Sequence, residues 1–175
     1  MADEQLFLDG EVRWRISAAW ATKNHDCTPH GIQARCHGRC CFSKTFWPAA
    51  AFKNPSGVCG YLGPEGCTHS ADDKPVACHL YPLMLKHGML QQYFRNTCGP
   101  HGLCRGNHGQ GPMLIDAIRD SLVHLFGQEQ YDRVRADVLA GRDGWFDVPP
   151  DVARAAALEL EDAEAMRITP PRSQR

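Results

Sequence analysis

The sequence predicts a mainly α protein with little β structure: a compact Cys-rich, metal-organised lobe with a short β-hairpin, packed against C-terminal helices. Three observations lead to this prediction. All nine cysteines lie between Cys27 and Cys104. The segment around them is rich in Gly and Pro, whereas residues 111–167 show the apolar spacing of helices. A chain of 175 residues fits a single domain of this kind.

Residues 1–24 are compatible with two structures. In LFLDGEVRWRI, the dipeptide Asp9-Gly10 stands between alternating residues, which is typical of a hairpin. Val12 and Ile16 equally follow helical spacing. Of the two, we favour a helix over residues 11–23.

Residues 25–110 form the predicted Cys-rich metal-binding lobe. They hold all nine cysteines and eight of the nine histidines, and we expect mostly loop. In YPLMLKHGMLQQYF, two apolar runs flank Lys86-His87-Gly88, which predicts a β-hairpin. Cys78 precedes the first strand and Cys98 follows the second, so this hairpin would bring those two positions together.

Residues 111–167 are predicted to form helices that pack on the lobe, and residues 168–175 a flexible tail. Pro112 begins the first helix, Gly141 ends the second, and Pro149-Pro150-Asp151 begins a third that runs to about residue 166. The first two helices carry apolar stripes, formed by Leu114, Ile118, Leu122 and Leu125 and by Tyr131, Val134 and Val138.

Charge and hydropathy restrict the partners and the cellular location that the sequence predicts. Lys and Arg number 19 against 20 Asp and Glu, for a net charge of −1, so nucleic acid is not a favoured partner. MADEQLFLDGEVRWR has no apolar core of a signal peptide, and no stretch reaches the ~18 apolar residues of a membrane span. We therefore expect a cytoplasmic protein with no membrane association. Thiols stay reduced there, and dense cysteines more often hold metal than form disulfides.

The cysteines fall into groups. Cys27 stands alone, CHGRCC contains Cys36, Cys40 and Cys41, CGYLGPEGC contains Cys59 and Cys67, and KPVACHLYP contains Cys78, with Cys98 and Cys104 following. A zinc ion or an iron–sulfur cluster takes about four protein ligands. Consecutive side chains in extended backbone point to opposite sides. Cys40 and Cys41 would then serve two centres, or one ligates while the other packs.

In this order, CHGRCC, CGYLGPEGC and KPVACHLYP resemble the YkgJ-type zinc- or iron-chelating cysteine-cluster proteins. Cys59, Leu62 and Cys67 match that family's C-x-x-L…C segment. KPVACHLYP matches its R-P-x-x-C-x-x-Y-P element, with Lys in place of Arg, and Cys98 is similar to a late cysteine of the family. The resemblance covers about residues 27–100.

The sequence departs from the family in its first cysteines. Cys27 lies nine positions before Cys36, where the family has a tighter run. The three residues between Cys36 and Cys40 are similar to the spacing in the flagellin lysine-N-methylase branch. Cys104 has no counterpart in the family pattern.

The resemblance implies a bound iron–sulfur cluster or zinc. Proteins of this family are often labelled iron–sulfur oxidoreductases, but the resemblance implies no defined reaction. The predicted metal ligands are Cys36, Cys40, Cys41, Cys59, Cys67, Cys78 and Cys98, with Cys27 on weaker support. Cys27 and Cys104 each keep three open roles: ligand, redox-active thiol or packed side chain. His37, His69 and His79 lie close to cysteines, and His101 and His108 offer a small mixed site with Cys98. For each single histidine we favour a solvated or backbone-bonded side chain over a metal ligand.

We expect one or two iron–sulfur clusters, with [4Fe–4S] favoured, because the thiolates exceed one zinc site and the core ligand set lacks histidine. The function would be electron transfer, or support of a modifying enzyme as an accessory subunit, with a protein partner. The alternatives are a structural zinc-binding protein-interaction module and a metal-dependent oxidoreductase or methylase-related enzyme. No catalytic residue is predicted, since neither a radical-SAM cysteine arrangement nor a nucleotide-binding loop is present.

Overall fold

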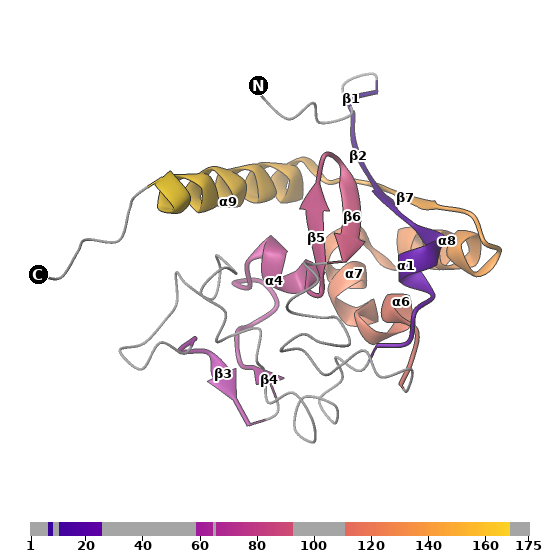
Figure 1. The fold of residues 1–175 in the computed structure, drawn as a ribbon, viewed down its shortest axis with the longest axis horizontal. Coiled ribbons are helices and arrows are strands. Elements are labelled where there is room, and N and C mark those ends of the chain that lie inside the picture. Colours follow the sequence, from indigo (N-terminus) through magenta and orange to yellow (C-terminus); the bar gives the residue numbers. More distant parts are fainter. Residues whose placement is uncertain (1–6, 9–10, 26–58, 65, 93–110, 169–175) are drawn as a thin grey trace, which may run out of the picture.

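The computed structural model describes residues 7–8, 11–25, 59–64, 66–92 and 111–168 (Figure 1). Of these residues, 46% are helical and 24% lie in strands, and a mixed four-stranded sheet lies at the centre. The prediction of a mainly α protein with little β structure is therefore wrong. The described part is organised by an apolar core between this sheet and the helices.

The sheet brings together strands from distant parts of the chain. Its order is β7 (Gly144–Asp147), β2 (Glu11–Ile16), β6 (Met89–Gln92) and β5 (Leu83–Lys86). β2 is antiparallel to β7 and parallel to β6, while β6 is antiparallel to β5. A further short strand, β1 (Phe7–Leu8), pairs with the beginning of β2.

The predicted helix over residues 11–23 is wrong. Residues 11–16 form β2, and the only helix in this stretch is α1 (Ala18–Ala21). Trp14 and Ile16 are 2% and 0% exposed, and they alternate with outward-facing arginines, which is the period of a strand. The register Phe7↔Val12 and Leu8↔Glu11 leaves two positions between β1 and β2, so the hairpin alternative is confirmed.

The hairpin predicted around Lys86-His87-Gly88 is confirmed. Lys86 pairs with Met89, and His87 and Gly88 between them have φ values of 50° and 69°. Two consecutive positive φ values define a type I′ turn, whose twist matches that of the flanking strands. The backbone N–H of Arg15 donates to the carbonyl of Gly88 at 2.9 Å, which ties this turn to β2.

The C-terminal helices are also confirmed, with one change. The predicted first helix is split at Ile118 into α6 (Leu114–Ala117) and α7 (Arg119–Phe126), and it is followed by α8 (Gln128–Leu139) and α9 (Pro150–Ile168). Gly141 ends α8 as expected. Its N–H donates to Val138 and that of Arg142 donates to Asp137, which is the Schellman arrangement.

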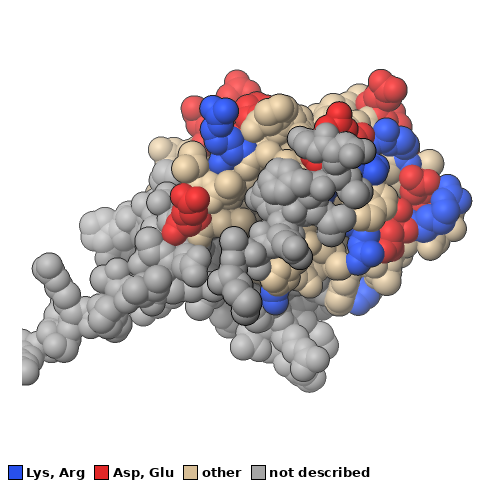
Figure 2. Space-filling view, turned by 90° about the horizontal axis from the view of Figure 1, so that it is seen from above, with Lys and Arg blue, Asp and Glu red and all other residues tan. Residues whose placement is uncertain are grey.

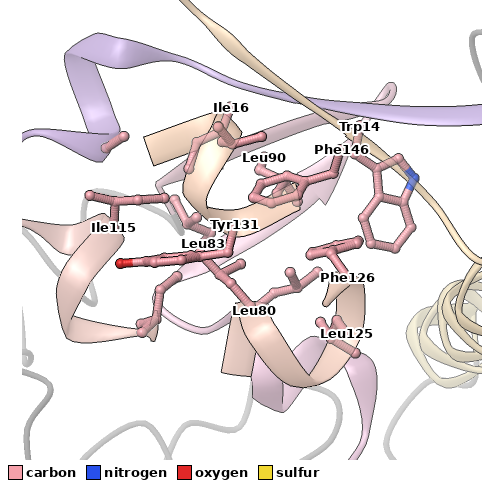
Figure 3. Packing of buried hydrophobic residues seen from close by; sticks show 14 of the residues in the cluster. Trp14, Ile16, Leu80, Leu83, Leu90, Ile115, Leu125, Phe126, Tyr131 and Phe146 are labelled. Carbon is pink, nitrogen blue, oxygen red and sulfur yellow. The ribbon is translucent and has the colours of Figure 1, made fainter. Parts of the chain in front are cut away.

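The core lies between the sheet and the helices (Figure 3). Phe146 of β7 stacks on Phe126 of α7 at 4.2 Å between ring centroids, and Trp14 meets Phe126 edge-on at 5.8 Å. Leu80 from the cysteine-bearing half is buried in the same cluster. The N-terminal strand, the middle of the chain and the C-terminal helices therefore share one core.

Charges of both signs are mixed on the described surface seen in Figure 2. Asp147 pairs with Arg13 and with Arg133, each at 2.9 Å, and Arg142 pairs with Asp137 at 2.6 Å. Exposed pairs of this kind contribute little to stability. The described residues of this face form no continuous basic stripe.

Gly144 of β7 packs closely against α8, without room for a side chain. A Cβ atom at this position would lie 2.6 Å from Cγ1 of Val134 and 3.3 Å from Cγ2 of Ile16. We expect Gly144→Ala to lower the free energy of unfolding by about 1–3 kcal/mol, because the added methyl group would overpack the core. Urea unfolding measures this change.

Gly141→Ala serves as the comparison for Gly144→Ala. Gly141 has open space around it and a φ of +76°, so only backbone strain of about 1 kcal/mol is expected. A Gly144→Ala protein as stable as the wild type would contradict the packing described here.

Candidate metal centre

Three of the predicted ligands lie in the described part of the chain: Cys59, Cys67 and Cys78. The remaining predicted ligands lie outside the described residues; these are Cys27, Cys36, Cys40, Cys41 and Cys98, and Cys104 lies outside them as well. The candidate centre is therefore built here from the three described cysteines and what holds them.

Cys59 and Cys67 belong to one small hairpin. It consists of β3 (Leu62–Gly63) and β4 (Gly66–Cys67), and Leu62 pairs with Cys67. The carbonyl of Cys59 accepts the N–H of Leu62 at 3.1 Å, so Cys59 is tied to the same unit. Cys59 is 8% exposed, whereas Cys67 is exposed. CGYLGPEGC thus places one cysteine inside and one at the surface.

The hairpin is closed by contacts of Tyr61. Its carbonyl accepts both the N–H and the hydroxyl of Thr68, at 2.7 Å and 2.9 Å, and its ring stacks on His69 at 3.6 Å. The sequence predicts loop here. The Gly-Pro-Glu-Gly turn between Leu62 and Cys67 is the signal that would have predicted this hairpin.

Cys78 lies in the short helix α4 (Val76–Leu80). Val76 and Leu80 enter the main core, whereas half-buried Cys78 packs, like Tyr81 and Met84, against a second apolar cluster. α4 therefore links the main core to the surroundings of a predicted ligand. An apolar shell around a thiolate ligand influences the redox potential of the metal it binds.

His79, next to Cys78, is held in its neutral form. It is 3% exposed, its Nε2 lies 2.9 Å from the carbonyl of Ala71, and its ring stacks on that of His124 in α7. Because a carbonyl only accepts, Nε2 carries the proton. Burial lowers the pKa of His79 to about 4, opposed by the Ala71 hydrogen bond and assisted by the charge of Lys74.

The first turn of α4 is capped by Glu159 of α9. Glu159 Oε1 accepts the N–H of Val76 at 2.8 Å, and Oε2 accepts that of Ala77 at 2.9 Å. Burial raises the pKa of Glu159, while the two backbone hydrogen bonds act in the opposite direction. Glu159 is not among the functional residues predicted from the sequence. Its spacing from Val152 and Ala156, on the packed face of α9, is the signal that could have found it.

The donor chemistry of the described residues suits a thiophilic metal, but they form no complete site by themselves. Within the ranges that the structure describes, no three Cys, His, Asp or Glu side chains lie close enough to hold one ion. A centre that includes Cys59, Cys67 or Cys78 therefore requires ligands from outside these ranges.

The comparisons with known proteins leave the family open. No protein-family model matches the chain, and no curated protein or solved structure does either. The resemblance to the cysteine-cluster proteins therefore rests on its motifs alone. None of the described helices combines the length and apolar character needed to cross a membrane.

The buried His79 predicts a pH-dependent stability. Its pKa is about 4 in the folded state and about 6.5 when unfolded, so the unfolded chain binds the extra proton first as the pH falls. Stability is lost between pH 6.5 and 4, by on the order of 2–3 kcal/mol. His79→Gln keeps a donor for Ala71 but does not titrate, so urea unfolding of this variant should depend less on pH over that interval.

His87→Asn is the matched control, since His87 is exposed in the β5–β6 turn. It should keep the pH dependence of the wild type. Equal pH dependence in His79→Gln and the wild type would show that His79 is not held neutral.

Proposed function

We propose that this protein binds metal through cysteine thiolates and carries one or two iron–sulfur clusters, of the [4Fe–4S] type. The observation that carries this proposal is the confinement of all nine cysteines to one stretch, in motifs ordered as in the cysteine-cluster proteins. The ligand set is drawn from the cysteines predicted from the sequence. Zinc in a structural module is the second candidate.

The surroundings of the described cysteines support this proposal. Cys59 directly follows the cysteine-bearing segment 26–58 and is tied to the hairpin that carries Cys67. Cys78 is anchored on the core through α4 and packs against the same apolar cluster as Tyr81 and Met84. An anchored, partly apolar ligand environment suits a redox cluster, whose potential depends on burial and hydrogen bonding at sulfur.

The role that fits these features is electron transfer, or support of a modifying enzyme as an accessory subunit. A cluster would accept and return single electrons through its sulfur ligands, and a protein partner would supply or consume them. The proposal places the protein in the cytoplasm, where thiolate ligands stay reduced. We assign no catalytic residue.

Metal and sulfide analysis of anaerobically purified protein tests the class of metal. Iron with acid-labile sulfide and a broad brown absorbance are expected. Colourless protein with stoichiometric zinc would favour the structural zinc module instead. Protein that contains neither metal, as purified or after reconstitution with either, would refute the proposal.

Cys78→Ser tests the ligand assignment. Because metal binding and folding of such segments are coupled, the variant should retain less than about half of the metal and unfold at lower urea concentration. Ala77→Ser introduces the same hydroxyl one position earlier in α4 and should retain the metal of the wild type. Full metal content in Cys78→Ser would exclude Cys78 from the ligand set.

A further inference from the structure

We propose that Glu159 is the positioning residue of the candidate metal centre: its carboxylate fixes the first turn of α4 and thereby holds Cys78 in place for the metal. This inference rests on the proposed function and names a determinant of the same site. It assigns Glu159 no contact with the metal. Its effect passes through the backbone of α4.

The contact is specific in its geometry. α9 passes beside α4 (Figure 1), and the two oxygens of Glu159 accept separate N–H groups, from Val76 and Ala77, at 2.8 Å and 2.9 Å. N–H groups in the first turn of a helix have no partner within the helix. Pro75, at the N-cap position, makes no side-chain hydrogen bond to the helix. Glu159, more than eighty residues later in the sequence, supplies the cap.

α4 depends on such outside contacts. It has five residues, and helices this short are not stable by themselves. One side is held by Leu80 in the main core, and His79 is held by Ala71 and His124. Glu159 holds the beginning of the helix by binding the amides of Val76 and Ala77. Cys78 is the next residue in the chain. Release of the first turn would therefore loosen the backbone that carries the Cys78 thiol.

The burial of Glu159 argues against an incidental contact. Val152 and Ala156 of α9 already pack against the main core, and Glu159 shares their side of the helix. Burying a carboxylate is costly unless hydrogen bonds to the charged form compensate. The two amides of α4 offset part of this cost for half-buried Glu159, and they are the hydrogen bonds that hold this helix turn.

A second carboxylate, Asp116, serves as a control. It distinguishes an effect on the position of Cys78 from an effect on global stability. Asp116 in α6 accepts the hydroxyl of Tyr131 at 3.0 Å and pairs with Arg135 of α8 at 2.7 Å. This cluster also joins helices through one carboxylate, but it involves neither α4 nor α9. Loss of Asp116 should lower stability without acting on Cys78 directly.

The experiment compares metal-loaded wild-type protein with Glu159→Gln, Glu161→Gln and Asp116→Asn. Glu161 is the matched control, since it is exposed on the same helix. Gln at 159 offers one acceptor oxygen in place of two. Glu159→Gln should release metal to a chelator about 10–100-fold faster, as for other residues that orient metal ligands. The visible absorption and circular dichroism of the iron–sulfur form, or of the cobalt-substituted form of a zinc protein, should change as well.

Glu161→Gln should behave as the wild type in both measurements. Asp116→Asn should unfold at lower urea concentration but keep the release rate and the spectrum. If Glu159→Gln is not recovered folded, Glu159→Asp replaces it. Aspartate keeps the charge with a shorter reach, and its release rate should lie between those of the wild type and a protein without the cap.

Three results would overturn the inference. The first is a Glu159 variant that matches Glu161→Gln in both release and spectrum. The second is equal acceleration of release in the Glu159 variant and Asp116→Asn, which would mean that release only follows global stability. The third is wild-type protein that binds no metal, which refutes the proposed function itself and with it this inference. In the first two results the wild type is loaded with metal, so the two kinds of failure are distinguishable.

Discussion

The strand β2 is the element on which the rest of this structure depends. It is paired with β7 on one side and β6 on the other, and these strands belong to the C-terminal and middle parts of the chain. Burial of Trp14 and Ile16 against Phe126, Phe146 and the helices gives the sheet its apolar face. Both strand ladders and the core would be lost together without β2. The N-terminal residues therefore hold the halves of the chain as one unit.

α4 connects this core to the candidate metal centre. Leu80 lies in the core, His79 rests against His124 of α7, and Glu159 of α9 caps the first turn. Cys78 lies between these attachments. The C-terminal helices thus contribute to the surroundings of a predicted ligand, although they contain no cysteine. For a metal protein this arrangement couples the stability of the helices to the geometry of the ligand.

Local signals predicted the elements that depend on neighbouring residues. Gly141 ends α8 because the cap found there needs a residue that tolerates positive φ. The type I′ turn at His87-Gly88 follows from the two-residue length of the loop and from the glycine at its second position. The strand at residues 11–16 was mistaken because a short segment with two large apolar residues fits either period. Its partner β7 is distant in the sequence, so no local window contains the pairing that decides between them.

By itself, the sequence determined where the cysteines lie, their order in family-like motifs, the C-terminal helices and the β5–β6 hairpin. It also predicted the chemistry, since reduced cysteines in such number favour metal binding. Only the tertiary structure decided that the protein is built on a mixed sheet, that Cys59 is hydrogen-bonded to the hairpin that carries Cys67, and that Glu159 binds the backbone of α4. The reason is physical: caps, turns and ligand chemistry are local, whereas strand pairing and a carboxylate bound to a distant helix arise only when the folded chain brings separate segments together.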